Sequence, residues 1–202
     1  MGIRTCFFDM GNVLVTFSHQ TMCHNVAAAC HAELETVTSL LLKDELLFQL
    51  ECSHITEDQF HATVQKELNS SVTAEALKIA VSDIFELNDS IVPLLEDLKS
   101  SEVRLVLLSN TSVTHLNFIR DRFNVLDLFD DMTTSFAAGA LKPDAAIYQH
   151  ALARAQAAPS ECFFTDDIEA YVTAARRFGI HAEVYTDTER TRRQLRELGV
   201  PV

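Results

Sequence analysis

Four short polar clusters carry the side chains with which this chain could do chemistry: Asp9-Met10-Gly11-Asn12, Ser109-Asn110-Thr111, Lys142-Pro143 and Asp166-Asp167. In chain order they supply a carboxylate nucleophile, hydroxyl and amide donors, a fixed positive charge, and a pair of carboxylates. Paired carboxylates are ligands that hard cations such as Mg²⁺ prefer. The combination therefore predicts a site that binds and attacks an anionic group such as a phosphate.

Each cluster taken alone also has a purely structural interpretation. Asp9 before Gly11 could be a turn residue, and Ser109-Asn110 could cap the helix that follows. Lys142-Pro143 could be a surface turn. Asp166-Asp167 could be an acidic helix cap stabilised by the helix dipole. The chemical interpretation gains weight because all four clusters come directly after, or soon after, segments that look like strands.

Short apolar runs predict those strands at Thr5–Phe8, Val103–Leu108, Cys162–Thr165 and Ala182–Tyr185, with a weaker candidate at Met132–Ser135. Their hydrophobicity is continuous rather than alternating, which is typical of parallel strands covered on both faces. Open sheets of this kind bind ligands at the carboxyl ends of their strands. We therefore expect the four polar clusters to meet at one edge of the sheet.

Helical patterns separate the later strands, at Ser90–Ser101, Asp144–Ala157 and Tyr171–Phe178. Alternating strands and helices predict an α/β fold with a Rossmann-like, doubly wound parallel sheet. The stretch 18–87 differs, because it reads as successive amphipathic helices, one of which begins at a capping residue, Thr56. We expect residues 1–17 and 88–202 to form the core and residues 18–87 to form an inserted helical subdomain.

Composition and charge narrow the possible partners. The 202 residues contain 16 Lys and Arg against 29 Asp and Glu, a formal net charge of −13. This balance argues against a nucleic-acid or anionic-membrane surface, since both need basic patches. No apolar run approaches the roughly 20 residues of a membrane span, and the first residues make a poor signal peptide. We expect a cytoplasmic protein with reduced, mostly buried cysteines.

Taken together, the four clusters and the helical stretch resemble the haloacid dehalogenase-like (HAD) hydrolase superfamily over nearly the whole chain. The segments that match its four motifs are FFDMGNVLV, VLLSNTS, LKPDAAIYQHAL and FFTDDIEAYVTAARRFG, and the helical stretch corresponds to the family's cap. The DxGNV form, the LECSHITEDQF segment and the KPDAAIYQHAL segment look most like α-D-glucose 1-phosphate phosphatases and related sugar phosphatases.

The resemblance implies an activity and a role for each matching residue. It implies a Mg²⁺-dependent phosphatase that acts on a small phosphorylated metabolite, such as a sugar phosphate, as a monomer or homodimer. Asp9 stands at the nucleophile position, with Ser109 and Lys142 at the other catalytic positions. Substrate contacts would come from Met10, Gly11, Ser109, Asn110 and Lys142. Metal ligands would be the carboxylates of Asp9 and Asp166, the carbonyl of Gly11, and Asp167 directly or through water.

Two departures from the family pattern leave alternatives open. Most of these phosphatases carry a second Asp, the general acid and base, where this chain has Gly11, and an acid-base group is typically worth about a hundredfold to ten-thousandfold in rate. Tyr171 replaces a frequent Asn. The main alternative is therefore a catalytically impaired relative that binds a phosphometabolite or a protein partner. A metal-independent dehalogenase is a further alternative, and the Asp166-Asp167 pair argues against it. A sugar mutase is another, and Gly11 argues against that one.

Overall fold

The computed structural model describes residues 2–202 and is built around a five-stranded parallel sheet of order β5-β4-β1-β6-β7. The strands are β1 (Thr5–Phe8), β4 (Arg104–Ser109), β5 (Asp131–Thr134), β6 (Cys162–Asp166) and β7 (His181–Val184). Every predicted strand is confirmed to within one residue at each end. The order places β1, which precedes Asp9, at the centre of the sheet, between β4, which ends at Ser109, and β6, which ends at Asp166.

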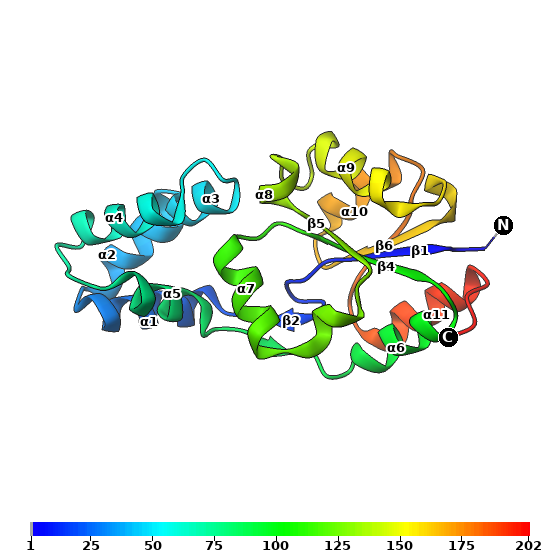
Figure 1. The fold of residues 1–202 in the computed structure, drawn as a ribbon, viewed down its shortest axis with the longest axis horizontal. Helices are drawn as coiled ribbons and strands as arrows, with labels where there is room; N and C mark the ends of the chain where they lie inside the picture. Colours follow the sequence, from blue (N-terminus) through cyan, green and yellow to red (C-terminus); the bar gives the residue numbers. More distant parts are fainter. Residues whose placement is uncertain (1) are drawn as a thin grey trace.

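Helices cover both faces of this sheet (Figure 1). On one side lie α8 (Ser135–Ala138), α9 (Ala145–Ala155) and α10 (Glu169–Arg176); on the other lie α6 (Val92–Ser100), α7 (Val113–Arg122) and α11 (Thr188–Glu197). Short 3₁₀ segments cover Asn124–Leu128 and Pro159–Glu161. The doubly wound α/β fold expected from the sequence is confirmed.

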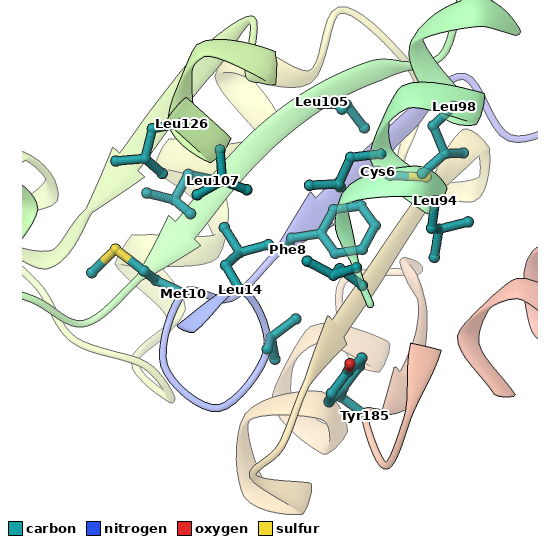
Figure 2. Close-up of a cluster of buried hydrophobic side chains, with 14 of the residues drawn as sticks. Cys6, Phe8, Met10, Leu14, Leu94, Leu98, Leu105, Leu107, Leu126 and Tyr185 are labelled. Carbon is teal, nitrogen blue, oxygen red and sulfur yellow. The ribbon is translucent and has the colours of Figure 1, made fainter. Parts of the chain in front are cut away.

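Alternation along β1 explains why both faces must be covered. Cys6 and Phe8 point into a core shared with α6, which Figure 2 shows together with Leu94 and Leu98. Phe7, between them, packs on the opposite side in a core shared with α9 and α10. All three side chains are fully buried. Burying an aromatic side chain stabilises a fold by about 2–3 kcal/mol, so both layers of helices are needed to exclude water from the side chains of this strand.

The helices between β2 and β3 gather at the end of the molecule away from α6, α9 and α11 (Figure 1). They are α1 (His19–Cys30), α2 (Leu34–Thr38), a π-helical turn (Ser39–Lys43), α3 (Leu46–Glu51), α4 (Glu57–Glu67) and α5 (Ala74–Ser82). Their apolar faces form a separate hydrophobic cluster that includes Met22, Leu41, Phe60 and Leu77. Thr56 begins α4 with a capping box to Gln59, as the sequence predicts. Within residues 2–202, none of the helices has both the length and the apolar character that crossing a membrane requires.

A short antiparallel ribbon marks where the chain leaves the sheet and returns to it. β2 (Val15–Thr16) pairs with β3 (Glu86–Leu87), and the amide of Asn88 then donates to Leu14 O at 2.9 Å. β3 is a correction to the expectation that residues 18–87 are wholly helical. A two-residue strand is too short to show a periodic pattern, and it forms because the backbone groups of the two crossing segments satisfy one another.

Candidate active site

A cavity of about 270 Å³ opens at the carboxyl ends of the central strands. Residues of the segments 1–17 and 88–202 that line it include Asp9, Met10, Gly11, Ser109, Asn110, Lys142 and Asp167. Residues of the helical segment 18–87 line it as well. Asp166 is fully buried beside Lys142. The structure therefore brings all the residues singled out in the sequence to one place, at the edge of the sheet where parallel α/β folds bind ligands.

The buried ammonium group of Lys142 joins two of the strand ends. Its Nζ lies 2.8 Å from Asp9 Oδ1 and 2.6 Å from Asp166 Oδ2. Burial works against the charge on the lysine, but the nearby carboxylates of Asp9 and Asp166 outweigh burial and raise the pKa of Lys142. Lys142 is therefore a fixed cation, and aromatic rings support it, since the Tyr171 ring centroid lies 5.2 Å from Nζ.

Three carboxylates converge at this site. Oxygen atoms of Asp9, Asp166 and Asp167 all lie within 4.8 Å of one another. Burial, together with the charge of Asp9, raises the pKa of Asp166 to about 7 despite the neighbouring Lys142. The cluster thus carries more negative charge than Lys142 neutralises. All three carboxylates offer oxygen ligands, so the donor set and the excess charge both fit a hard divalent cation such as Mg²⁺.

Asn12 orients the third carboxylate. Its Nδ2 donates a hydrogen bond to Asp167 Oδ2 at 2.9 Å. Its backbone is left-handed, with φ 54°, a conformation that asparagine adopts more readily than most residues. The loop is closed by Met10 O, which accepts from the amides of Leu14 and Val15 at 2.9 and 3.0 Å. This role of Asn12 was not predicted from the sequence, although a Gly-Asn pair after a strand is a signal for such a turn.

Phe17 explains why position 11 is glycine. A Cβ atom at Gly11 would lie 2.8 Å from Cε1 of the Phe17 ring, closer than real Cβ contacts come. The aromatic ring therefore occupies the space that a side chain at position 11 would need. The absence of the family's usual Asp at position 11 is thus accompanied by the packing of Phe17 against Gly11.

Asn110 fixes the backbone of Lys142 from the neighbouring strand end. Its Nδ2 donates to Lys142 O at 3.1 Å, and its Oδ1 accepts from Lys142 N at 2.8 Å. Asn110, for which the family resemblance implies a substrate contact, thus also holds the backbone of Lys142. Ser109 is almost fully buried at the cavity, and its Oγ makes one long hydrogen bond, 3.4 Å to Asn110 O.

Sequence reasoning did not identify several cavity residues: Phe17, just before the helical segment 18–87, and His19, Phe48, Glu51, Ile84 and Phe85 within it. Burial and the charge of Asp9 raise the pKa of Glu51 to about 7. The backbone of Glu51 reaches the core, because its carbonyl accepts from Ser135 Oγ at 2.8 Å. His115 Nε2 likewise lies 3.2 Å from Val81 O. No motif marks these residues, since they come from separate helices and from the loops between elements, and they meet only in the fold.

Comparisons with known proteins find chains that are similar over nearly the whole length. A sesquiterpene phosphatase of Aspergillus oryzae, astK, is 26% identical over 200 residues, which cover 96% of each chain. A HAD family enzyme from Bacteroides thetaiotaomicron, solved as a magnesium complex, matches with a TM-score of 0.83 at 22% identity over 96% of this chain and all of that one. The same enzyme was also solved with magnesium and inorganic phosphate.

A HAD-like family hydrolase from Porphyromonas gingivalis matches equally well, with a TM-score of 0.82 at 25% identity, covering 97% of this chain and 99% of that one. The model of the haloacid dehalogenase-like hydrolase family matches residues 3–179, which is most of the chain. The fold, the meeting of four motifs at one sheet edge and this match support one conclusion: the chain belongs to the haloacid dehalogenase-like hydrolases.

Proposed function

We propose that this chain is a Mg²⁺-dependent phosphatase that hydrolyses a small phosphomonoester, with Asp9 as a nucleophile that is transiently phosphorylated. The observation that carries the proposal is the contact of Lys142 with both Asp9 and Asp166, beside Asp167, at the cavity. The relatives add support, because one is named a phosphatase and another was solved with magnesium and phosphate.

In the first step, a carboxylate oxygen of Asp9 attacks phosphorus, and the bond between phosphorus and the ester oxygen breaks. The alcohol leaves with that electron pair and takes up a proton. Lys142 holds the attacking carboxylate and offsets the negative charge that gathers on the phosphoryl oxygens. The Ser109 hydroxyl, which lines the same cavity, would donate to one of those oxygens.

In the second step, water attacks the phosphorus of the aspartyl phosphate. The bond between Asp9 and phosphorus breaks, the water gives up a proton, and inorganic phosphate and the free carboxylate result. Asp9, Asp166, Asp167 and the Gly11 carbonyl would hold Mg²⁺, which when bound supplies positive charge that lets the two anions approach. The helical segment 18–87 would act as a cap that excludes water and contacts the organic group.

One alternative is favoured by a specific observation. Gly11 has no side chain to transfer protons, and the Phe17 ring fills the space beside it. A protein that binds a phosphorylated metabolite without turning it over would tolerate this arrangement. The phosphatase proposal accommodates it when the leaving alcohol is protonated by water or by another cavity group.

Phosphate release from a panel of phosphomonoesters tests the proposal, with Mg²⁺ and with EDTA. Wild type should release phosphate only with Mg²⁺. Asp9→Asn should release it at least about a thousandfold more slowly, because the nucleophile is gone. Asp127→Asn, at an exposed position, is the matched control and should keep the wild-type rate. Wild type that binds Mg²⁺ but releases phosphate from no compound would favour the binding protein. Asp9→Asn at the wild-type rate would remove Asp9 from its role.

A further inference from the structure

Outside the acidic cluster, much of the cavity lining is apolar. The side chains that form this apolar part are Phe17, Phe48, Ile84, Phe85, Leu141 and Ile168. Aromatic rings are contiguous along it, since the centroids of Phe17 and Phe85 lie 5.9 Å apart and those of Phe85 and His115 lie 5.2 Å apart. Such a wall binds a ligand by excluding water from apolar surface.

Two of these side chains are exposed. Phe48 on α3 is 47% exposed and Ile168, just before α10, is 42% exposed. They come from the helical segment and from the core, yet both line this one cavity. Apolar side chains from two separate segments that line one cavity are typical of a ligand-binding surface.

The polar groups of the cavity are largely engaged within the protein. Asn110 holds Lys142, Asn12 holds Asp167, and the His115 ring contacts Val81 O. Glu51, His19 and Tyr171 are further titratable side chains that line the cavity. A sugar carries several hydroxyl groups that lose their water on binding and each need a partner, and unpaired ones cost affinity. A hydrocarbon has no such requirement.

We propose that the organic group of the substrate is a hydrocarbon chain of the terpenoid kind, so that the enzyme hydrolyses an apolar monophosphate in preference to a sugar phosphate. The proposal rests on the proposed phosphatase function. Lys142 and the acidic cluster would take the phosphate, the aromatic wall would take the chain, and Phe48 and Ile168 would cover its outer part. The name of the Aspergillus relative, a sesquiterpene phosphatase, agrees with this assignment.

A substrate series tests the proposal on the wild-type enzyme with Mg²⁺. Isopentenyl, geranyl and farnesyl monophosphate are compared with glucose 1-phosphate and glucose 6-phosphate, below the concentrations at which the long chains form micelles. Each buried methylene favours binding roughly fourfold. We therefore expect kcat/KM to rise at least about tenfold from the five-carbon to the ten-carbon substrate, and to exceed that for both sugar phosphates.

Variants locate the effect on the molecule. Phe48→Ser should lower kcat/KM for geranyl monophosphate at least about tenfold, mainly through KM, and Phe48→Leu should recover most of the loss. Ile79→Ser is the matched control, because Ile79 is 52% exposed on α5 and does not line this cavity. It should keep the wild-type kcat/KM. A thermal melt confirms that each variant folds.

The outcomes separate the two proposals. Sugar phosphates hydrolysed faster than geranyl monophosphate, or rates independent of chain length, would overturn the hydrocarbon assignment while leaving the phosphatase in place. An equal loss in Phe48→Ser and Ile79→Ser would also overturn it, since the effect would not belong to the cavity. No phosphate release from any compound would instead refute the phosphatase itself.

Discussion

At the scale of single residues, position 11 shows how one side chain restricts another. Gly11 does not have a left-handed backbone, so a larger residue there is limited by space rather than by φ. The space is taken by Phe17, which also lines the cavity. The ring therefore serves two purposes, because it leaves room for no side chain at position 11 and it offers an apolar surface to a ligand.

This packing predicts that Gly11→Ala lowers the free energy of unfolding by about 1–2 kcal/mol, since the new methyl group must displace the Phe17 ring. Urea denaturation measures the change. In a Phe17→Leu background the same substitution should cost clearly less, because the ring atom that it meets is gone. Equal costs in the two backgrounds would show that Phe17 does not restrict position 11.

At the scale of elements, the sequence predicted the sheet well and the cavity wall poorly. Strands such as Thr5–Phe8 and Cys162–Asp166 are buried on both faces, so their composition alone marks them. The polar residues at their ends are adjacent to them in sequence, which is why Asp9 and Asp166 could be identified. Phe48 lies on α3 and Phe85 lies between α5 and β3, and only the tertiary packing of these segments brings them to one cavity.

The contact between α5 and α7 predicts a sensitivity to acid. His115 on α7 is buried against Val81 O, and burial lowers the pKa of its imidazole to about 4, compared with 6.5 for a free histidine. The folded chain therefore favours the neutral ring. The lowered pKa of His115 leaves the free energy of unfolding unaffected above pH 6.5. It lowers that free energy by up to about 3 kcal/mol as the pH falls from 6.5 to 4, because the unfolded chain takes up the proton first.

His115→Gln checks this expectation, because an amide side chain can still donate to Val81 O but takes up no proton. The free energy of unfolding is measured between pH 4 and pH 7, and the variant should lose less stability than wild type over that range. His24→Gln, at an exposed position on α1, is the control and should follow the wild-type curve. Parallel curves for His115→Gln and wild type would contradict the assignment to His115.

At the scale of the whole molecule, electrostatics opposes the binding of an anionic substrate. The chain carries a formal net charge of −13, and three of its carboxylates converge at the cavity. Global attraction therefore cannot bring a phosphate to the site. Local positive charge has to attract the phosphate. Histidines aside, Lys142 is the cationic side chain that lines the cavity within residues 2–202. The folded molecule is thus built to gain from a bound divalent cation.

We accordingly expect Mg²⁺ to stabilise the whole fold. The unfolded chain does not hold Asp9, Asp166 and Asp167 together, so a cation at about 100 times its Kd should add about 2.7 kcal/mol of stability. For a chain of this size that corresponds to a rise in Tm of roughly 5–10 °C.

NaCl at equal ionic strength controls for screening of the overall charge. Asp166→Asn should lose most of the Mg²⁺-dependent rise, whereas Asp127→Asn, which removes one surface charge, should keep it. An equal rise in both variants would mean that Mg²⁺ acts on the surface charge and not at the cluster, because only Asp166→Asn removes a carboxylate from the cavity.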